Sequence, residues 1–533
     1  MTRVINFGTM YPKGCVQMKT VIGIDYGTKS ARAVLVDASN GAVLCSHTVD
    51  YPHGVLEGSL ASIDDYDEAL VELLTAVTPP AYRETVTAIG VDATACTVVC
   101  VDETGSPLAK RPAFRDREQA QVKLWKRHAA EPQANEILAI ARELHEPFLK
   151  RTGNTVSSEW MLPKLLEMRD LDREVYDAAD RAFDLCEYLV FCLTNVPARS
   201  TGPLGFKGLW SEEGLPTDAF LDAVRPGLAA EYAHLMRGDV TVPGQPVGRL
   251  SAAWCERLGL SPDVTVASGL IDGFTATAAL GALRVGDAAL VIGTSNVITV
   301  QLPAFREIEG VCGIVKDGMV AGAYSLEGGQ NCTGDMLEWY MSNALPADIK
   351  TQADERGISP HQLLCERVRE PWNNTVVVLD WFNGSRNVPC DLSLRSVMMG
   401  LSVETKPEDI YLALLQSIAC GSREVLEQCR ANGIAIERVV ATGGMAQKNA
   451  LLMKQYAELL GLPVQVGQVE EGPAFGTALF AAVAAGLYPD VNAAYERMGI
   501  HDFTVYEPTP DRRDAYEKLY QKHHALRQLM SEQ

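Results

Sequence analysis

A short turn between two strand-like segments carries residue types suited to phosphate chemistry. Residues 21–37 read as two strands, of which the first ends at Asp25, and the turn that follows supplies Gly27, Thr28, Lys29 and Ser30. Backbone N–H groups freed by such a turn can hold phosphate oxygens. A carboxylate two residues before the glycine can hold the water shell of a metal ion. This segment therefore predicts a phosphate site beside a metal site.

A second hairpin repeats this design in the other half of the chain. Residues 289–300 again read as two apolar strands, with Gly293, Thr294 and Ser295 at the turn. One such hairpin is weak support for a site, because apolar hairpins are common. Two of them in separate halves predict a duplicated nucleotide-binding architecture that grips phosphates from both sides.

Two further loops have residue types that could meet a ligand. In residues 439–449 a strand leads to a helix through Gly443 and Gly444. These glycines allow close backbone approach and the helix N-terminus favours negative charge, although a plain strand–helix turn is the alternative. Asp272 lies in a glycine-flanked segment just before a helix-like stretch. Its carboxylate could accept a proton from a substrate hydroxyl, or it could cap the helix.

Size and charge limit the classes of function. The chain has 533 residues, which is too long for one compact core and predicts at least two domains. Its formal net charge of −21 opposes non-specific binding to nucleic acid or to anionic membranes. The 13 cysteines form no Cys-x-x-Cys pair, which favours reduced thiols and a cytoplasmic location over a disulfide framework or a zinc site. No apolar run reaches the roughly 18 residues that a membrane span needs.

The alternation of strand-like and helix-like segments predicts a layered α/β fold with two units. Helices are expected in the first unit at 65–76, 117–130, 158–169 and 184–194. The second unit restarts the pattern near 289, and its longest helix is expected at 407–431. The expected division is a dispensable leader at 1–19, an N-terminal domain at 20–281, a C-terminal domain at 282–490 and a helical tail at 491–533.

Several catalytic classes lack their sequence signatures. No Gly-Lys dipeptide occurs, so a Walker A loop is missing, and no Gly-x-Gly-x-x-Gly fingerprint is present. Neither Gly-x-Ser-x-Gly nor His-Glu-x-x-His occurs. P-loop hydrolysis, hydride transfer, serine hydrolase chemistry and zinc-protease chemistry are therefore disfavoured.

The three loops resemble those of the FGGY family of carbohydrate kinases, within the actin-like ATPase superfamily, and the resemblance runs from about residue 20 to about 490. The run 25–32, which ends at Arg32, is similar to the family's first phosphate loop. Residues 293–295 are similar to the second, and 442–449, which ends at Asn449, to the adenosine loop. The resemblance implies an α/β fold of two ribonuclease-H-like (actin-like ATPase) domains with an interdomain cleft.

The two family signatures fit unequally. The C-terminal signature, from 396 to 401 and along the helix that follows, departs from the family pattern only at Leu414. The N-terminal signature around 164–167 fits poorly, because Glu167 stands where the family has an aromatic residue.

Further segments resemble the branch of the family that phosphorylates ribulose, namely 91–96, 122–128, 158–160, 205–210, 327–330 and 380–386. By this resemblance Asp272 is the catalytic base. Lys207 and Glu327 would contact the sugar beside the loop that carries Ala95 and Cys96. A polyol site needs donors such as lysine, acceptors such as carboxylates and a flat apolar surface such as Trp125, so the residue types agree.

The resemblance implies ATP-dependent phosphorylation of the terminal hydroxyl of L-ribulose to give L-ribulose 5-phosphate. ATP and Mg²⁺ are the expected cofactors, with the metal held through water by Asp25. The expected partner is a small sugar rather than nucleic acid or a membrane, and the assembly could be a homodimer. Three alternatives stay open: a kinase for D-ribulose, ribitol or xylulose, a non-kinase actin-like ATPase that moves partners, and a catalytically silent sugar sensor.

Overall fold

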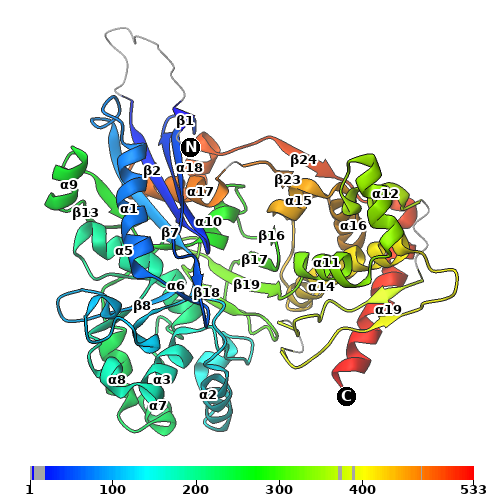
Figure 1. Cartoon of the computed structure of the whole chain (residues 1–533), viewed down its shortest axis with the longest axis horizontal. Helices are drawn as coiled ribbons and strands as arrows, with labels where there is room; N and C mark the ends of the chain where they lie inside the picture. The colour runs from blue at the N-terminus through cyan, green and yellow to red at the C-terminus, as the bar shows by residue number, and fades with distance from the viewer. Residues whose placement is uncertain (1–2, 5–17, 370–374, 387–389, 470, 533) are drawn as a thin grey trace.

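The computed structural model describes residues 3–4, 18–369, 375–386, 390–469 and 471–532 (Figure 1). The predicted leader therefore lies mostly outside the described residues. The described part of the leader is residues 18–19 and β1 (Arg3–Val4), which pairs antiparallel with strand β4 (Val43–Asp50).

The N-terminal half is built on an eight-stranded sheet whose central part follows a simple order. Strands β4, β3 and β2 are antiparallel, and β7 and β14 continue the sheet parallel to β2. The short β15 also pairs with β7, and β13 closes the far edge. The bounds are β2 (Thr20–Tyr26), β3 (Ser30–Asp37), β7 (Val86–Ala93), β13 (Pro246–Arg249), β14 (Thr265–Ala267) and β15 (Leu270–Ile271).

The C-terminal half repeats this arrangement in a seven-stranded sheet. Strands β19, β17 and β16 are antiparallel, and β22 and β23 continue parallel to β16. The second predicted hairpin is therefore confirmed as β16–β17, just as the first is β2–β3. The bounds are β16 (Asp287–Ile292), β17 (Asn296–Leu302), β18 (Gly313–Lys316), β19 (Tyr324–Gln330), β22 (Arg438–Thr442), β23 (Val464–Gly467) and β24 (Phe503–Tyr506). The predicted duplicated α/β architecture is thus confirmed.

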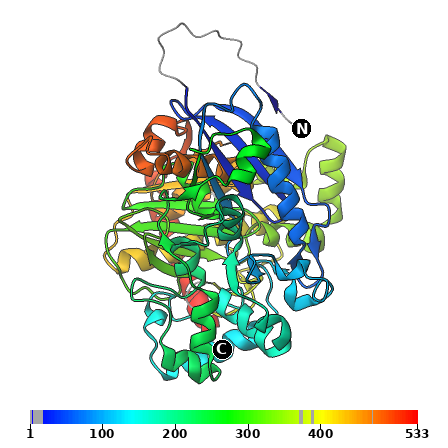
Figure 2. The same cartoon turned by 90° about the vertical axis from the view of Figure 1, so that its left-hand side faces the viewer.

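Helices cover both faces of the N-terminal sheet, and one of them comes from the far end of the chain. Helices α1 (Ile63–Val77) and α5 (Leu185–Thr194) pack on one face. The opposite face is covered by α17 (Gly472–Ala484), which contacts β2, β3 and β7 and lies against α10 (Asp272–Ala278). Figures 1 and 2 both place the orange α17 beside the blue strands.

Glycines allow this helix to approach the sheet closely. A Cβ atom added at Gly23 of β2 would lie 1.9 Å from the backbone oxygen of Ala474, and one at Gly476 would lie 1.9 Å from that of Thr275. The C-terminal half thus completes the core of the N-terminal sheet through α17, whose alanines pack on Val21, Val34 and Ala88.

A mostly helical region lies between β7 and β13 and has a hydrophobic core of its own. A second sheet in the order β10-β8-β9-β6-β5 combines strands β8, β9 and β10 of this region with β5 and β6, which come before α1, and α9 follows β13. The bounds are β5 (Val55–Leu56), β6 (Leu60–Ala61), β8 (Val98–Val101), β9 (Val122–Lys123), β10 (Arg181–Asp184), α2 (Glu131–Glu143), α3 (Met161–Leu171), α4 (Arg173–Asp177), α6 (Thr201–Lys207), α7 (Asp218–Val224), α8 (Leu228–Leu235) and α9 (Ala252–Leu258).

The predicted helix at 117–130 is wrong. The segment forms a single 3-10 turn at Glu118–Ala120 and the short strand β9, and α2 begins only at Glu131. Tertiary contacts override the helical pattern here, because Lys123 is buried and donates to the Gln119 oxygen while Arg127 is buried against Glu167. The long helix is confirmed as α14 (Pro407–Ala431).

The chain ends in a helix that packs on the C-terminal half. Helix α19 (Arg513–Ser531), drawn red in Figure 1, contacts α14, α16 (Ala450–Leu460) and β20 (Val377–Val378). The remaining helices and strands of this half are α11 (Gly334–Trp339), α12 (Ala347–Arg356), α13 (Pro360–Arg367), β21 (Met398–Met399), α15 (Gly444–Lys448) and α18 (Val491–Met498). Among the described residues, no helix combines the length and apolar character needed to cross a membrane.

Candidate active site

Strand register brings three carboxyl groups to one edge of the N-terminal sheet. Asp25 on β2 is the register partner of Asp92 on the neighbouring β7. Ile271 of β15 pairs with Ala93, the residue after Asp92, so Asp272 follows directly at the same edge. These are the carboxyl ends of parallel strands, where α/β folds commonly hold their ligands.

Asp272 is the first residue of α10, and Ile271 holds the N-cap position. The predicted alternative of a helix cap therefore does not hold. Its Oδ1 accepts a hydrogen bond of 2.7 Å from the backbone N–H of Gly273. Burial raises the pKa of Asp272 to about 7, and the charges of Asp25, Asp184 and Glu327 act in the same direction. A carboxyl with this pKa can exchange a proton near neutral pH.

Asp25 and Asp92 differ in the charge that each can carry. Burial raises the pKa of both carboxyls, and Arg32 opposes this at Asp25 because its Nε lies 3.2 Å from Asp25 Oδ2. Asp92 instead faces the charge of Asp25 and accepts hydrogen bonds from the hydroxyls of Thr275 and Thr477. Asp92 is thus the member of the pair that keeps a proton, and Asp25 the one that carries charge.

Lys207 and Glu327 form a buried ion pair between the two halves of the molecule. Lys207 ends α6, and its Nζ lies 2.8 and 2.9 Å from the two carboxylate oxygens of Glu327. Both side chains are nearly excluded from solvent. Burial by itself would lower the pKa of Lys207, but the charge of Glu327 outweighs it and raises that pKa above its ordinary value. Glu327 lies within β19 (Tyr324–Gln330).

The loop with Ala95 and Cys96 lies beside this ion pair. Hydrogen bonds to the backbone of Cys96 hold the loop in place. Asp184 accepts a 2.8 Å hydrogen bond from the Cys96 N–H, and the buried Lys164 donates to the Cys96 carbonyl at 2.6 Å. The same ammonium donates to the Leu124 carbonyl at 2.8 Å, so it ties this loop to the segment of Trp125. Burial raises the pKa of the Cys96 thiol to about 12, although Lys207 lowers it. The thiol therefore stays protonated and is no nucleophile.

Trp125 connects the predicted sugar side to the first phosphate turn. Its indole Nε1 donates a 3.0 Å hydrogen bond to Thr28 Oγ1. In that turn the Gly27 N–H bonds the Ser30 carbonyl at 3.0 Å, and Lys29 is exposed. Arg32 reaches Glu471 as well as Asp25, with its NH1 3.3 Å from Glu471 Oε2.

The second hairpin turn and the predicted adenosine loop lie against each other. A Cβ at Gly443, where φ is +96°, would lie 2.4 Å from the Ile292 oxygen, so only glycine fits there. Thr333 Oγ1 donates to the Gly293 carbonyl at 2.9 Å and Thr333 N–H to that of Thr294 at 2.8 Å, which fixes the turn. The turn leaves Thr294 exposed and Ser295 half-buried.

Two predicted ATP residues stand apart from these contacts. Asn449 caps α16 by accepting from the Leu452 N–H at 2.9 Å, and its amide donates to the Tyr411 hydroxyl at 3.2 Å. Gly444 begins α15, where an added Cβ would meet no atom within 4 Å. Their roles as ATP contacts stay predictions.

Several polar residues of the site were missed by sequence reasoning. They are Asp92, Asp184, Lys164, Thr275, Glu471 and Thr477, which hold the predicted residues in place. Asp92 could have been found, since it lies at the end of a strand within the segment 91–96. Thr477 and Glu471 carry no such signal, because they come from α17 and its N-cap, 385 residues from Asp92 and 439 residues from Arg32.

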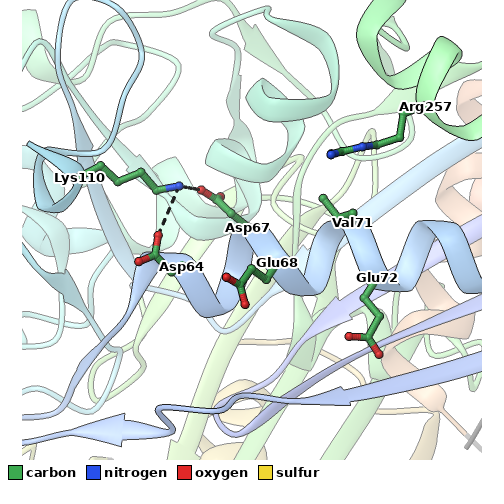
Figure 3. Close-up of a pocket in the computed structure, with 7 residues that line it drawn as sticks. All are labelled: Asp64, Asp67, Glu68, Val71, Glu72, Lys110 and Arg257. Atoms are coloured by element: carbon green, nitrogen blue, oxygen red, sulfur yellow. Dashed lines mark hydrogen bonds and ion pairs between the residues drawn. The ribbon is translucent and has the colours of Figure 1, made fainter.

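A surface pocket of about 440 Å³ lies elsewhere, along helix α1 (Figure 3). Its lining is acidic apart from two cations and one valine, and Lys110 is already paired with Asp64 and Asp67. None of the predicted site residues is among its seven lining residues: Asp64, Asp67, Glu68, Val71, Glu72, Lys110 and Arg257.

Comparisons with known proteins assign the family. Residues 20–203 match the N-terminal domain of the FGGY family of carbohydrate kinases, and residues 288–485 match its C-terminal domain. The chain is 37% identical to a ribulokinase of Shouchella clausii, over 95% of this chain and 94% of that protein. It is 35% identical to a ribulokinase of Mycolicibacterium smegmatis, over 94% and 92% of the two chains.

Solved structures share the fold. A xylulose kinase of Lactobacillus acidophilus superposes with a TM-score of 0.79 at 18% identity, and the match covers 96% of this chain and 99% of that one. A glycerol kinase of Plasmodium falciparum, solved with ADP, superposes with a TM-score of 0.75 at 16% identity, over 95% and 97% of the chains. With both domains matched in order, the chain belongs to the FGGY family of carbohydrate kinases and is an ATP-dependent sugar kinase.

Proposed function

We propose that the enzyme transfers the γ-phosphoryl group of ATP to the terminal hydroxyl of L-ribulose, giving L-ribulose 5-phosphate and ADP. The observation that carries this proposal is the buried Lys207–Glu327 pair, which joins the two halves within the electrostatic reach of Asp272. Lysine donates and glutamate accepts, so the pair can read an array of sugar hydroxyls. The curated ribulokinases, which match this chain over nearly its whole length, support the choice of sugar.

Asp272 is the proposed general base. It would take the proton of the terminal hydroxyl as that oxygen bonds to the γ-phosphorus and the bond to the ADP oxygen breaks. A pKa near 7 leaves a substantial ionised fraction at neutral pH, which base catalysis requires. Positioning and charge stabilisation do most of the remaining work in such transfers.

The nucleotide would be held between the two hairpin turns. The first would supply Gly27, Thr28, Lys29 and Arg32, and the second Gly293, Thr294 and Ser295. Gly443, Gly444 and Asn449 are the proposed adenosine contacts. Support comes from the packing of Gly443 on Ile292, which brings the predicted adenosine loop to the second turn.

A magnesium ion fits the residues at Asp25. Among the described residues no three His, Cys, Asp or Glu side chains converge as a closed metal site. Magnesium commonly uses one or two carboxylates together with phosphate oxygens and waters, so a single charged carboxylate beside a phosphate turn suffices. Asp25 would hold it through water, and the ion would supply charge neutralisation on the phosphates.

Every cysteine that the structure describes is a free thiol, the state that a reducing compartment maintains. We therefore propose that the enzyme works in the cytoplasm.

The sugar assignment is tested by measuring ADP formation with the four 2-ketopentoses, ribitol, xylitol and glycerol. L-Ribulose should give the highest kcat/KM, with D-ribulose or ribitol next. A wrong sugar that leaves Lys207 or Glu327 unpaired should lose roughly 5- to 150-fold, because an unsatisfied buried polar group costs about 1–3 kcal/mol. Higher kcat/KM with xylulose or glycerol would refute the assignment and leave the kinase activity standing.

The site residues are tested separately with Lys207→Met and Glu327→Gln. Each should raise KM for the sugar by more than it raises KM for ATP, because the pair faces the sugar rather than the nucleotide. The melting temperature of each variant is measured alongside, since breaking a buried pair also destabilises the fold. Equal effects on both substrates would place the pair outside the sugar site.

A further inference from the structure

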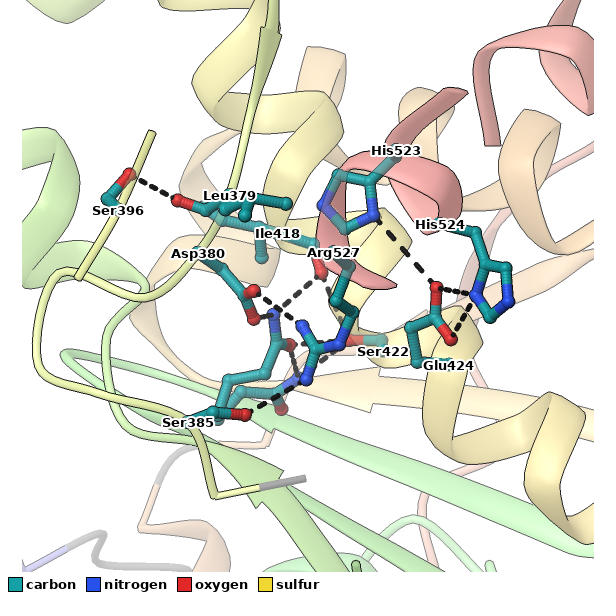
Figure 4. Close-up of polar contacts among 12 residues, drawn as sticks. Leu379, Asp380, Ser385, Ser396, Ile418, Ser422, Glu424, His523, His524 and Arg527 are labelled. Carbon is teal, nitrogen blue, oxygen red and sulfur yellow. Dashed lines mark hydrogen bonds and ion pairs between the residues drawn. The ribbon is translucent and has the colours of Figure 1, made fainter. Parts of the chain in front are cut away.

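Helix α19 inserts a buried arginine into the C-terminal half, next to a loop formed by residues 380–386. Arg527 NH1 lies 3.1 Å from Asp380 Oδ1, and its NH2 donates to Ser385 Oγ at 3.0 Å (Figure 4). The guanidinium also stacks 4.9 Å from the ring centre of the buried Trp381. One planar side chain thus holds both ends of the loop, a geometry that lysine cannot reproduce.

The last residue of this loop reaches across to the N-terminal half. Arg386 NH2 lies 3.6 Å from Glu159 Oε1. Burial lowers the pKa of Arg386, but the charge of Glu159 outweighs it, and the Cys312 thiol and Glu327 add to the upward shift. Glu159 in turn acts on Cys96 and Lys164. Glu327 of the Lys207–Glu327 pair is thus among the charges that act on Arg386.

Asp380 also connects Arg527 to the strands of the site through a chain of hydrogen bonds. Its Oδ2 accepts from Gln330 Nε2 at 2.8 Å, and Gln330 Oε1 accepts from Asn296 Nδ2 at 3.0 Å. Gln330 ends the strand that carries Glu327, and Asn296 follows the turn of the second hairpin. Helix α14 comes close enough because it has Gly421, where an added Cβ would lie 2.3 Å from Asp380 Oδ2.

We propose that Arg527 is a positioning residue for the sugar site, and that Arg386 is a further sugar-specificity residue that it sets in place. Arg527 fixes the loop 380–386, so that Arg386 meets Glu159 and closes the two halves over the sugar beside the Lys207–Glu327 pair. The C-terminal helix, which lies beyond the two matched family domains, thereby becomes part of the substrate site. This inference rests on the sugar site proposed above.

A purely structural role for Arg527 would have different effects on stability and on the two KM values. A buried ion pair that only holds α19 in place would affect thermal stability and both substrates alike. A positioning role affects KM for the sugar through Arg386, which is only partly buried and can be changed without leaving a fully buried charge unpaired. The two roles are therefore separable by a split between the two KM values.

The experiment compares full-length Arg527→Lys, Arg386→Gln and the double variant with the wild type. The sugar is whichever substrate gives the highest kcat/KM. Arg386→Gln should raise KM for the sugar about 10-fold or more, the effect typical of losing one charge-assisted hydrogen bond. Arg527→Lys keeps the positive charge but loses the two-pronged hydrogen bonding of the guanidinium. It should raise KM for the sugar about 3- to 10-fold. KM for ATP should stay within about twofold, and the double variant should be no worse than Arg386→Gln, because both act by one route.

Glu517→Gln is the matched control. Glu517 lies on the same helix and pairs with Arg423 of α14, with 2.6 Å between Arg423 NH2 and Glu517 Oε2. Among the described residues, its hydrogen bonds and ion pairs go to Arg423 and Gln521 rather than to the 380–386 loop. It should lower the melting temperature slightly and leave both KM values unchanged.

Three results would overturn the inference, and the third would also remove the proposed sugar site. A lower melting temperature with unchanged KM for the sugar in Arg527→Lys would make Arg527 structural only. An unchanged KM in Arg386→Gln beside a raised one in Lys207→Met would remove Arg386 from the site and leave the proposed sugar site intact. If Lys207→Met also left KM unchanged, both this inference and that site would fall.

Discussion

Asp272 owes its proposed role to its surroundings more than to its position in the sequence. The carboxyl lies in a cluster of acidic groups, and burial together with Asp25 raises its pKa to about 7. A carboxyl base must be ionised to accept a proton, so Asp272 cannot act as the general base once it is protonated below about pH 7. Activity should therefore rise with pH through this range and fall on the acid side.

The substitution Asp272→Asn should abolish proton acceptance at this position. The amide keeps the size of the side chain and cannot accept the proton, so kcat should fall at least about 10²–10⁴-fold with the Kd for ATP nearly unchanged. In the wild type, log(kcat/KM) for the sugar should bend near pH 7, and the bend should vanish in the variant. Retention of more than about a tenth of wild-type kcat would leave Asp272 as an orienting group.

The residues of the site were predictable where a local pattern marked them. Asp25 and the glycine turns stand out because strand, carboxylate and turn follow each other within ten residues. Lys164 does not, because an isolated lysine in a helix usually faces solvent. Only the folded chain shows that its ammonium joins two carbonyls of separate loops.

Glu167 shows how a departure from a family signature can be explained. Its carboxylate is buried and pairs with the buried guanidinium of Arg127, which also donates to the Gly58 carbonyl at 2.7 Å. An ion pair thus takes the place where the family has an aromatic side chain. The sequence showed the mismatch, and only the structure supplies the partner.

At the scale of elements, the hairpins and the long helices were predictable because each has an unbroken apolar period. The predicted strands of both hairpins lie within about two residues of β2–β3 and β16–β17. The segment 117–130 was not predictable, since its path follows contacts that the chain makes with residues far away. The local sequence pattern of α17 likewise does not predict that this helix packs on the sheet of the N-terminal half.

Helix α19 carries a second buried ionisable group, His523, which lies among Asp380, Arg527, His524 and Glu424. Neither of its ring nitrogens has a hydrogen-bond partner among the described residues. Burial lowers the pKa of His523 to about 4, whereas an unfolded chain titrates at 6.5. Below pH 6.5 His523 binds a proton in the unfolded state but stays neutral in the folded state. The stability of the fold therefore falls as the pH drops from 6.5 to 4.

His523→Leu should remove this dependence. The leucine fills a similar volume and cannot be protonated. When the pH drops from 7 to 4, the free energy of unfolding should therefore fall by about 3 kcal/mol less in the variant than in the wild type. Chemical denaturation at several pH values measures the difference. Parallel pH curves for the two proteins would show that His523 is protonated in the folded state.

At the scale of the whole molecule, the two halves repeat one sheet order but do not pack as two separate bodies. Helix α17 belongs to the second half by sequence, yet it forms one face of the first core. Its Thr477 hydroxyl also donates to Asp92, so the same helix supports the active site.

A cut at the predicted domain boundary tests this interlocking. A fragment of residues 18–281 lacks α17 and leaves Val21, Val34 and Ala88 uncovered, so it should aggregate or bind hydrophobic dyes when produced alone. Co-expression with residues 282–533 should restore a soluble, active pair. A monomeric 18–281 fragment with cooperative unfolding would show that the first core is complete without α17.

The late position of α17 also has a consequence for the ribosome-bound chain. Strand β7 ends at Ala93 and α17 begins at Gly472, so nearly 400 residues must be synthesised between strands β2, β3 and β7 and the helix that covers them. At about 5–20 residues per second, these three strands wait roughly 20–80 s with one apolar face open. During that interval the chain depends on chaperones or on slow collapse, and the enzyme's yield in a cell should respond to translation speed more than its final stability does.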